Sequence, residues 1–100
     1  MAEIENDDLI PLSHPGVTLL EDVMEPLNLT AYALAKALDV PVSRIDAIVS
    51  GRRSITADTA IRLGAYLGMR PEYWLALQSG YELDEAKRNT KINVKQRAAV

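Results

Sequence analysis

The sequence predicts an all-α domain built from five helices. Apolar residues make up 48% of its 100 residues, with no Phe and a single Trp, so the core must consist mainly of Leu, Ile, Val and Ala. Such side chains suit closely packed helices, and the length allows one small domain. Apolar residues also recur at helical spacing in five segments. We divide the chain into an acidic arm over 1–12, a helical domain over 13–88 and a basic tail over 89–100.

The first helix is expected to follow the acidic arm, which is either flexible or docks on a basic partner. Ser13 or His14 would cap this helix, and Pro15 suits its first turn. Pro26 and Asn28 would end it. His14 is the only histidine, which favours a capping or packing role over metal binding. The predicted apolar face consists of Val17, Leu20, Val23, Met24 and Leu27.

The next two helices lie in the stretch around which the chain is organised, 30–51. Thr30 can cap the first of them through its hydroxyl, and Asp39 can leave it in the left-handed conformation. Pro41 turns the chain, and Gly51 marks the end of the second helix. Two short helices joined by such a turn form a helix-turn-helix pattern. Their predicted buried residues are Ala31, Leu34, Ala35 and Leu38, then Ile45, Ile48 and Val49.

A fourth helix is expected to begin after Thr56 and to end at Gly68. Asp58 in its first turn suits the positive end of the helix dipole. Gly64 costs about 1 kcal/mol of helix propensity relative to Ala, so we expect close packing of another helix there. The predicted inward face consists of Ala60, Leu63, Gly64 and Leu67, with Ile61 on the flank.

A fifth helix is expected from Pro71 to about Arg88, in a segment that holds the only Trp and two of the four Tyr. Aromatic residues are enriched at interfaces, so this segment either completes the core or mediates self-association. The predicted dimer contacts are Tyr73, Trp74, Leu77 and Tyr81. The tail that follows is either a short strand around Ile92 and Val94 or disordered.

The net charge of −3 conceals an asymmetry along the chain. Residues 1–25 carry seven acidic side chains and no Lys or Arg, whereas the residues after Glu85 carry five basic side chains and no acidic one. From Lys36 to Arg62 there are five basic and three acidic side chains. Because local charge decides phosphate binding, this central segment is compatible with nucleic acid.

No enzyme is expected from these residues. The serines have no Gly-x-Ser-x-Gly turn to activate them, and there is no Gly-rich phosphate loop and no cluster of metal ligands. We therefore expect no catalytic residue, no cofactor and no metal. Without Cys there are no disulfides, no apolar run approaches the roughly 18 residues that span a membrane, and the acidic start does not resemble a secretory signal. A cytoplasmic protein is expected.

The helix-turn-helix pattern predicts which residues would meet DNA. The first residues of the second helix reach base edges in the major groove. Val42 and Ala47 suit thymine methyl groups, and Ser43 suits a polar base edge. Asp46 could accept from cytosine, and Arg44 could bind guanine or a phosphate. We predict base or groove contacts from Val42, Ser43, Arg44 and Ala47, and phosphate contacts from Thr30, Tyr32, Arg52 and Arg53. The same helices could also form a plain bundle.

Two motifs frame the helical domain, His14-Pro15-Gly16 at its start and PEYWLALQ over 71–78. Further residues between these motifs match the pattern of one known protein family. They are Glu25-Pro26-Leu27, Leu29-Thr30, Tyr32-Ala33-Leu34-Ala35, Val40-Pro41, Arg44-Ile45, Ile48-Val49, Gly51, Ile55-Thr56-Ala57-Asp58-Thr59-Ala60 and Arg62-Leu63. With these motifs, residues 13–88 resemble the HigA-type antitoxins, a branch of the Xre-like (lambda-repressor-like) helix-turn-helix proteins.

This resemblance implies a five-helix, lambda-repressor-like domain that dimerises, binds a palindromic operator and represses its own operon. It also implies a HigB-type toxin, an mRNA endonuclease that the antitoxin neutralises by binding. A dimer formed through the fifth helix would place two recognition helices about 34 Å apart, one turn of DNA.

Three residues depart from the family pattern. Asp39 replaces the usual turn glycine, Ala31 replaces a glutamine, and Arg70 stands where Ser or Thr would cap the last helix. Ala31 has no side-chain group for a phosphate, which leaves that role to the backbone or to Tyr32. Two other functions remain open: a stand-alone repressor without a toxin, and a protein-interaction module whose acidic arm and first helix hold a basic toxin.

Overall fold

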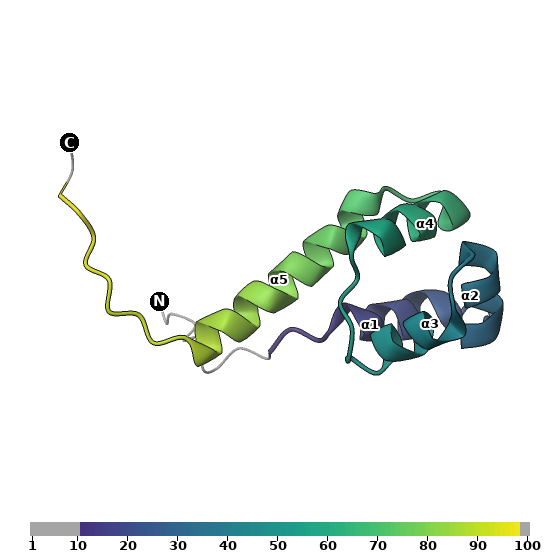
Figure 1. Cartoon of the computed structure of the whole chain (residues 1–100), viewed down its shortest axis with the longest axis horizontal. Helices are drawn as coiled ribbons and strands as arrows, with labels where there is room; N and C mark the ends of the chain where they lie inside the picture. Colours follow the sequence, from purple (N-terminus) through teal and green to yellow (C-terminus); the bar gives the residue numbers. More distant parts are fainter. Residues whose placement is uncertain (1–10, 99–100) are drawn as a thin grey trace, which may run out of the picture.

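The structure is a computed structural model that describes residues 11–98 (Figure 1). Its helices are α1 (Pro15–Thr18), η2 (Leu19–Met24), α2 (Ala31–Leu38), α3 (Val42–Val49), α4 (Ala57–Leu67) and α5 (Pro71–Asn89). No strand occurs in this part of the chain, so the predicted all-α, helix-turn-helix fold is confirmed. Residues 90–98 form neither a helix nor a strand, which makes the alternative of a short strand there wrong. The predicted acidic arm lies outside the described residues except for its last two.

Helix α1 begins at the cap that the sequence predicted. His14 Nδ1 accepts a hydrogen bond from the Gly16 N–H at 2.9 Å, so His14 and not Ser13 is the capping residue. Pro15 occupies the first helical position, where a missing N–H leaves nothing unsatisfied.

The second half of the predicted first helix is a π-helix, η2, and not the regular α-helix that we expected. The Glu25 N–H donates to the Leu20 carbonyl, five residues back, at 2.9 Å. This bonding brings residues five apart onto one side, so Leu19 and Met24 are both buried. The predicted face was therefore wrong in part: it omitted Leu19, and it included Leu27, which is 55% exposed.

Helices α2 and α3 follow the predicted boundaries because local capping sets them. Thr30 Oγ1 accepts from the Ala33 N–H at 3.0 Å, and Asp39 ends α2 in the left-handed conformation with φ of 58°. Helix α3 begins after Pro41, and Gly51 follows it with φ of 81°. Ile45 and the other predicted core positions of α2 and α3 are buried or partly buried.

The close approach predicted at Gly64 is confirmed, but its nearest neighbour is the backbone in the link after α4 and not a packed helix. A Cβ added there would lie 2.5 Å from the Met69 carbonyl oxygen, so only Gly allows the chain to fold back after α4. Gly68 ends α4 with φ of 71°. Thr56 occupies the N-cap position, but its side chain makes no capping hydrogen bond. Arg70 also provides no side-chain cap for α5, whose first residue is a proline.

The core lies between α1, η2, α2, α3, α4 and the first half of α5. The second half of α5 extends away from this bundle toward the C-terminal tail (Figure 1). The buried apolar residues are Leu19, Val23, Met24, Leu34, Ala35, Leu38, Ile45, Ile48, Ile55, Ala60, Leu63 and Trp74. Trp74 is fully buried, so of the two roles open for the aromatic segment this ring completes the core.

Candidate nucleic-acid interface

The start of helix α3 is the exposed part of the helix-turn-helix. Val42 is 40% exposed and Ser43 is exposed, whereas Ala47 in the next turn is only partly exposed. Ile45 and Ile48 are fully buried and hold the opposite face of α3 on the core. The first turn of α3 therefore presents an apolar and a hydroxyl side chain to solvent, at the end from which the second helix of a helix-turn-helix contacts base edges.

Arg44, which we expected to reach a base or a phosphate, has a partner within the chain. Its Nη1 lies 2.5 Å from Asp58 Oδ2 at the start of α4, and only 21% of its side chain is exposed. The hydrogen bond from Arg44, followed by one from Arg62, lowers the pKa of Asp58. The sequence did not reveal this pair because Asp58 lies fourteen residues away on another helix. Arg44 ties α3 to α4.

Arg62 extends this ion pair to the end of α2. Its Nε donates to Asp58 Oδ2 at 3.0 Å, and its Nη1 donates to the Leu38 carbonyl at 2.8 Å and the Asp39 carbonyl at 3.2 Å. These carbonyls belong to the last residue of α2 and to the turn. Arg44, Asp58 and Arg62 therefore join the two helices of the motif and the turn between them to α4.

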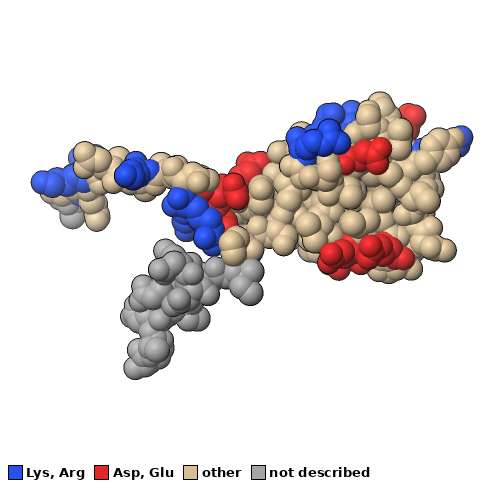
Figure 2. Space-filling view, turned by 90° about the horizontal axis from the view of Figure 1, so that it is seen from below, with Lys and Arg blue, Asp and Glu red and all other residues tan. Residues whose placement is uncertain are grey.

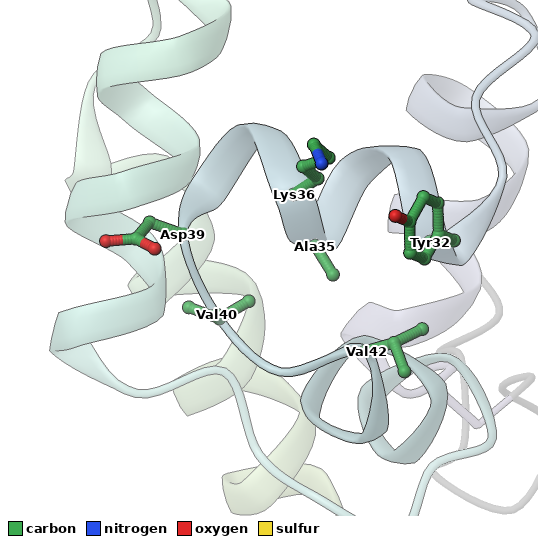
Figure 3. Close-up of a pocket in the computed structure, with 6 residues that line it drawn as sticks. All are labelled: Tyr32, Ala35, Lys36, Asp39, Val40 and Val42. Atoms are coloured by element: carbon green, nitrogen blue, oxygen red, sulfur yellow. The ribbon is translucent and has the colours of Figure 1, made fainter.

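A groove lies between α2 and the start of α3, with a volume of about 310 Å³ (Figure 3). Tyr32 and Val42 lie at one end of it, and Asp39 and Val40 at the other. Tyr32 is 66% exposed, and Lys36 Nζ lies 5.9 Å from the centre of its ring. Lys36 was not among the predicted phosphate contacts, but it lies one helical turn from Tyr32 and lines the same groove.

Arg52 and Arg53 follow two residues after the end of α3 and are exposed, as the phosphate prediction requires. The main-chain N–H groups of both residues donate to the Ala47 carbonyl, at 2.8 Å for Arg52 and 3.1 Å for Arg53. The Arg52 Nε also donates to Ser50 Oγ at 2.9 Å. The structure thus holds the main chain of both arginines, and the guanidinium group of Arg52, beside the end of α3.

The His14-Pro15-Gly16 motif seats α1 against α3. A Cβ added to Gly16 would lie 1.9 Å from the Ile48 carbonyl oxygen, so this approach requires Gly. The His14 ring contacts the Tyr81 ring edge to face, with 5.1 Å between centroids. Burial is the main cause that lowers the pKa of His14, while a hydrogen bond with the Arg53 main chain and the charge of Glu82 act against it.

The residues predicted for the dimer interface differ in exposure. Tyr73 is 44% exposed, and Leu77 and Tyr81 are partly buried. Trp74 has no exposed surface, so its ring cannot contact a second copy directly, and we no longer place it in an interface. The sequence pattern could not show which of the two is buried, because Tyr73 and Trp74 are adjacent aromatic residues in the same turn of α5.

Charged groups of both signs are distributed over the surface in separate patches. Figure 2 shows Lys and Arg side chains along the tail and in a separate group on the helical body, with acidic side chains nearby. In residues 11–98, no three His, Cys, Asp or Glu side chains group in a way that could hold a metal ion. No helix of this part is long and apolar enough to cross a membrane.

Several known proteins are similar to this chain in sequence and in fold. Residues 20–74 match the family HTH_3, described as helix-turn-helix. The chain is 46% identical to virulence-associated protein I of Dichelobacter nodosus over 85% of this chain and 80% of that protein. A HigA-family addiction module antidote protein from Coxiella burnetii is 43% identical, with a TM-score of 0.75 over 79% of this chain and 86% of that one. Antitoxin HigA of Pseudomonas aeruginosa, solved with the higBA promoter, is 38% identical, with a TM-score of 0.75 over 77% and 84%.

Proposed function

This chain belongs to the helix-turn-helix family and, within it, to the HigA-type antitoxins, and we propose that it is a dimer that represses its own operon and neutralises a partner toxin. The family consists of DNA-binding regulators and antitoxins and not of enzymes. The cytoplasm, where DNA and mRNA meet, is the proposed location.

The observation that carries the DNA-binding proposal is the exposed start of α3, together with two exposed arginines in the loop after this helix. We propose that Val42, Ser43 and Ala47 lie in the major groove, with Val42 against a thymine methyl group. The proposed phosphate contacts are Thr30, Tyr32, Arg52 and Arg53. Arg44 is assigned instead to the ion pair that holds α3 on α4.

The proposed DNA partner is a palindromic operator near the gene for this chain. The Pseudomonas aeruginosa relative was solved with the higBA promoter, and antitoxin GraA was solved with its operator. A symmetric dimer needs two half-sites about 34 Å apart, one turn of DNA. Tyr73 on α5 is the exposed member of the predicted dimer contacts.

The proposed protein partner is a HigB-type toxin. Its support is the family and the exposed acidic side chains of Glu21, Asp22 and Glu25, which would suit a basic protein. The test is co-purification with the product of the neighbouring gene, with the full chain and with a chain that lacks residues 1–12. Retention after truncation would contradict a role for the acidic arm, and no binding by the full chain would favour a stand-alone repressor.

Footprinting and titration on the DNA upstream of the gene, over a series of salt concentrations, test the DNA proposal. We expect protection of a palindrome, and we expect Arg53→Ala to weaken binding to all sequences and to reduce the salt slope by about one unit. Arg70→Ala is the matched control, since Arg70 is exposed at the far end of α4. An unchanged slope for Arg53→Ala would contradict the phosphate contact.

A further inference from the structure

The loop that carries Arg52 and Arg53 is held at its start by α3 and by the residues before α1. The Gly51 N–H donates to the Ile48 carbonyl at 3.0 Å, and the next two N–H groups share the Ala47 carbonyl. The His14 ring lies beside this backbone, because a Cβ on Gly51 would be 3.9 Å from its Cγ. The main chain of the loop is therefore packed and hydrogen-bonded at its first residues.

The far end of the same loop is held by α5. Gln78 is 6% exposed, and its Oε1 accepts a hydrogen bond from the Ile55 N–H at 2.8 Å. Ile55 itself is 1% exposed, so its side chain anchors the loop in the core. A buried N–H needs a partner, and Gln78 is the group that provides it for Ile55.

Glu82, one turn further along α5, fixes the orientation of the Gln78 amide. The Gln78 Nε2 donates to Glu82 Oε2 at 2.8 Å, which sets the amide so that Oε1 faces Ile55. The Ser54 hydroxyl lies 3.5 Å from the same carboxylate oxygen. Two adjacent residues of the loop, Ser54 and Ile55, thus contact one amide–carboxylate pair on α5.

We propose that Gln78 and Glu82 are positioning residues for DNA binding, which set the backbone of the Arg52–Arg53 loop from α5. This inference rests on the proposed function, in which these arginines contact DNA phosphates. Neither Gln78 nor Glu82 touches DNA in this proposal. They keep the loop in one conformation, so that less freedom is lost when the arginines bind.

The primary test is Gln78→Met, which keeps the length of the side chain and removes both hydrogen bonds. We expect weaker operator binding, a salt slope reduced by about one unit, and faster amide hydrogen exchange at Ile55. Ser79→Ala is the control, since Ser79 is the exposed neighbour on α5 and its side chain makes no hydrogen bond within residues 11–98. Circular dichroism and sedimentation serve to check that the fold and the oligomeric state of each variant match those of the parent chain.

The exchange variant Gln78→Glu/Glu82→Gln provides the rescue. A carboxylate at position 78 still accepts from the Ile55 N–H, and an amide at position 82 donates to it, with no change in net charge. We expect tighter operator binding and a larger salt slope for the exchange than for Gln78→Glu alone, which places two carboxylates one helical turn apart. Because position 78 is buried, the carboxylate moved there keeps the affinity of the exchange below that of the parent chain. If Gln78→Met does not fold, this pair of variants decides the question, with Ser79→Asp as the control for added charge.

A double-mutant cycle with Arg53→Ala separates positioning from general stability. We expect Arg53→Ala to have less effect in the Gln78→Met background, because the arginine is already misplaced there. If Arg53→Ala reduces the slope and Gln78→Met does not, the positioning role is overturned and the DNA-binding proposal stands. If Arg52→Ala and Arg53→Ala both leave the slope unchanged, the phosphate contacts themselves are overturned, and the positioning role with them.

Discussion

Gly16 allows α1 to approach the backbone of α3 closely. Its Cα faces the Ile48 carbonyl at the end of α3, and any side chain there would meet backbone, which has no alternative rotamer. The Pro15 ring beside it is buried, so α1 cannot shift outward without exposing it. The placement of α3 therefore depends on one residue of α1.

We expect Gly16→Ala to lower the free energy of unfolding by about 1–3 kcal/mol, the range for overpacked sites. Urea unfolding followed by circular dichroism measures it. Gly80→Ala is the matched control: its Cβ would lie 3.8 Å from Leu12 Cδ1, an ordinary contact, and Ala favours the helix there. Equal unfolding curves for Gly16→Ala and the parent chain would contradict the close approach.

His14 predicts a dependence of stability on pH. Its pKa is lowered from 6.5 mainly by burial, so the folded chain holds this proton less tightly than the unfolded chain. The stabilisation is present above pH 6.5 and is lost as the pH falls through the lower pKa of the folded state. Protonation also removes the lone pair of Nδ1 that accepts from Gly16.

Urea unfolding between pH 8 and about pH 5 should therefore show a fall in stability that His14→Asn reduces. Asn accepts the same capping hydrogen bond and does not titrate in this range. Glu82, Tyr81 and the main chain of Arg53 surround the ring and stay in place in this variant. The same slope in both proteins would show that other groups cause the effect.

At the scale of the helices, Asp58 connects three elements through two arginines. It lies in the first turn of α4, where the helix dipole also favours its charge. Arg44 on α3 forms an ion pair with Asp58. Arg62 also binds Asp58 and donates a hydrogen bond to the carbonyl at the end of α2. The angle between the two helices of the motif thus depends on side chains outside the turn itself.

We expect Arg44→Ala and Asp58→Asn both to lower the thermal midpoint and to weaken DNA binding uniformly across sequences, since both loosen α3. Thermal unfolding and titration with operator and random DNA measure these effects. Glu72→Gln, which removes an exposed carboxylate beside Arg70, is the control. If Arg44→Ala relaxes a single operator position while Asp58→Asn leaves binding intact, Arg44 reads a base as first expected.

Helix boundaries were predictable from the sequence where a local residue sets them. Asp39, Gly51 and Gly68 all adopt positive φ at the predicted ends, because the residues beside them in sequence determine the turn. The π-helix was not predictable, since its bonding depends on which apolar residues the rest of the core accepts. The same holds for the contacts of Arg44 and Gln78, whose partners lie on other helices.

At the scale of the whole molecule, α5 has two parts. Its first half places Trp74 in the core, with Tyr73 packed edge to face against it at 5.2 Å between centroids. Its second half extends beyond the bundle, and Leu83 there is 57% exposed. Because α5 contains both core residues and exposed residues, the aromatic segment alone could not show whether it completes the core or mediates self-association.

Trp74→Ala and Tyr73→Ala separate these roles. We expect Trp74→Ala to lower the free energy of unfolding by about 3–5 kcal/mol, the range for large buried aromatics. We expect Tyr73→Ala to weaken self-association in sedimentation equilibrium with a much smaller loss of stability, because Tyr73 is 44% exposed. An unchanged association constant for Tyr73→Ala would remove Tyr73 from the dimer interface.

The position of Gln78 and Glu82 on α5 has a thermodynamic consequence. If α5 sets the conformation of the loop that binds phosphates, a protein that binds α5 and shifts it also changes the affinity for DNA. Such a protein does not need to contact α3. Linkage then requires the reverse: DNA must change the affinity for that protein by the same factor. The fraction of operator bound and the fraction of partner bound would then both depend on one coupling free energy, which acts through α5.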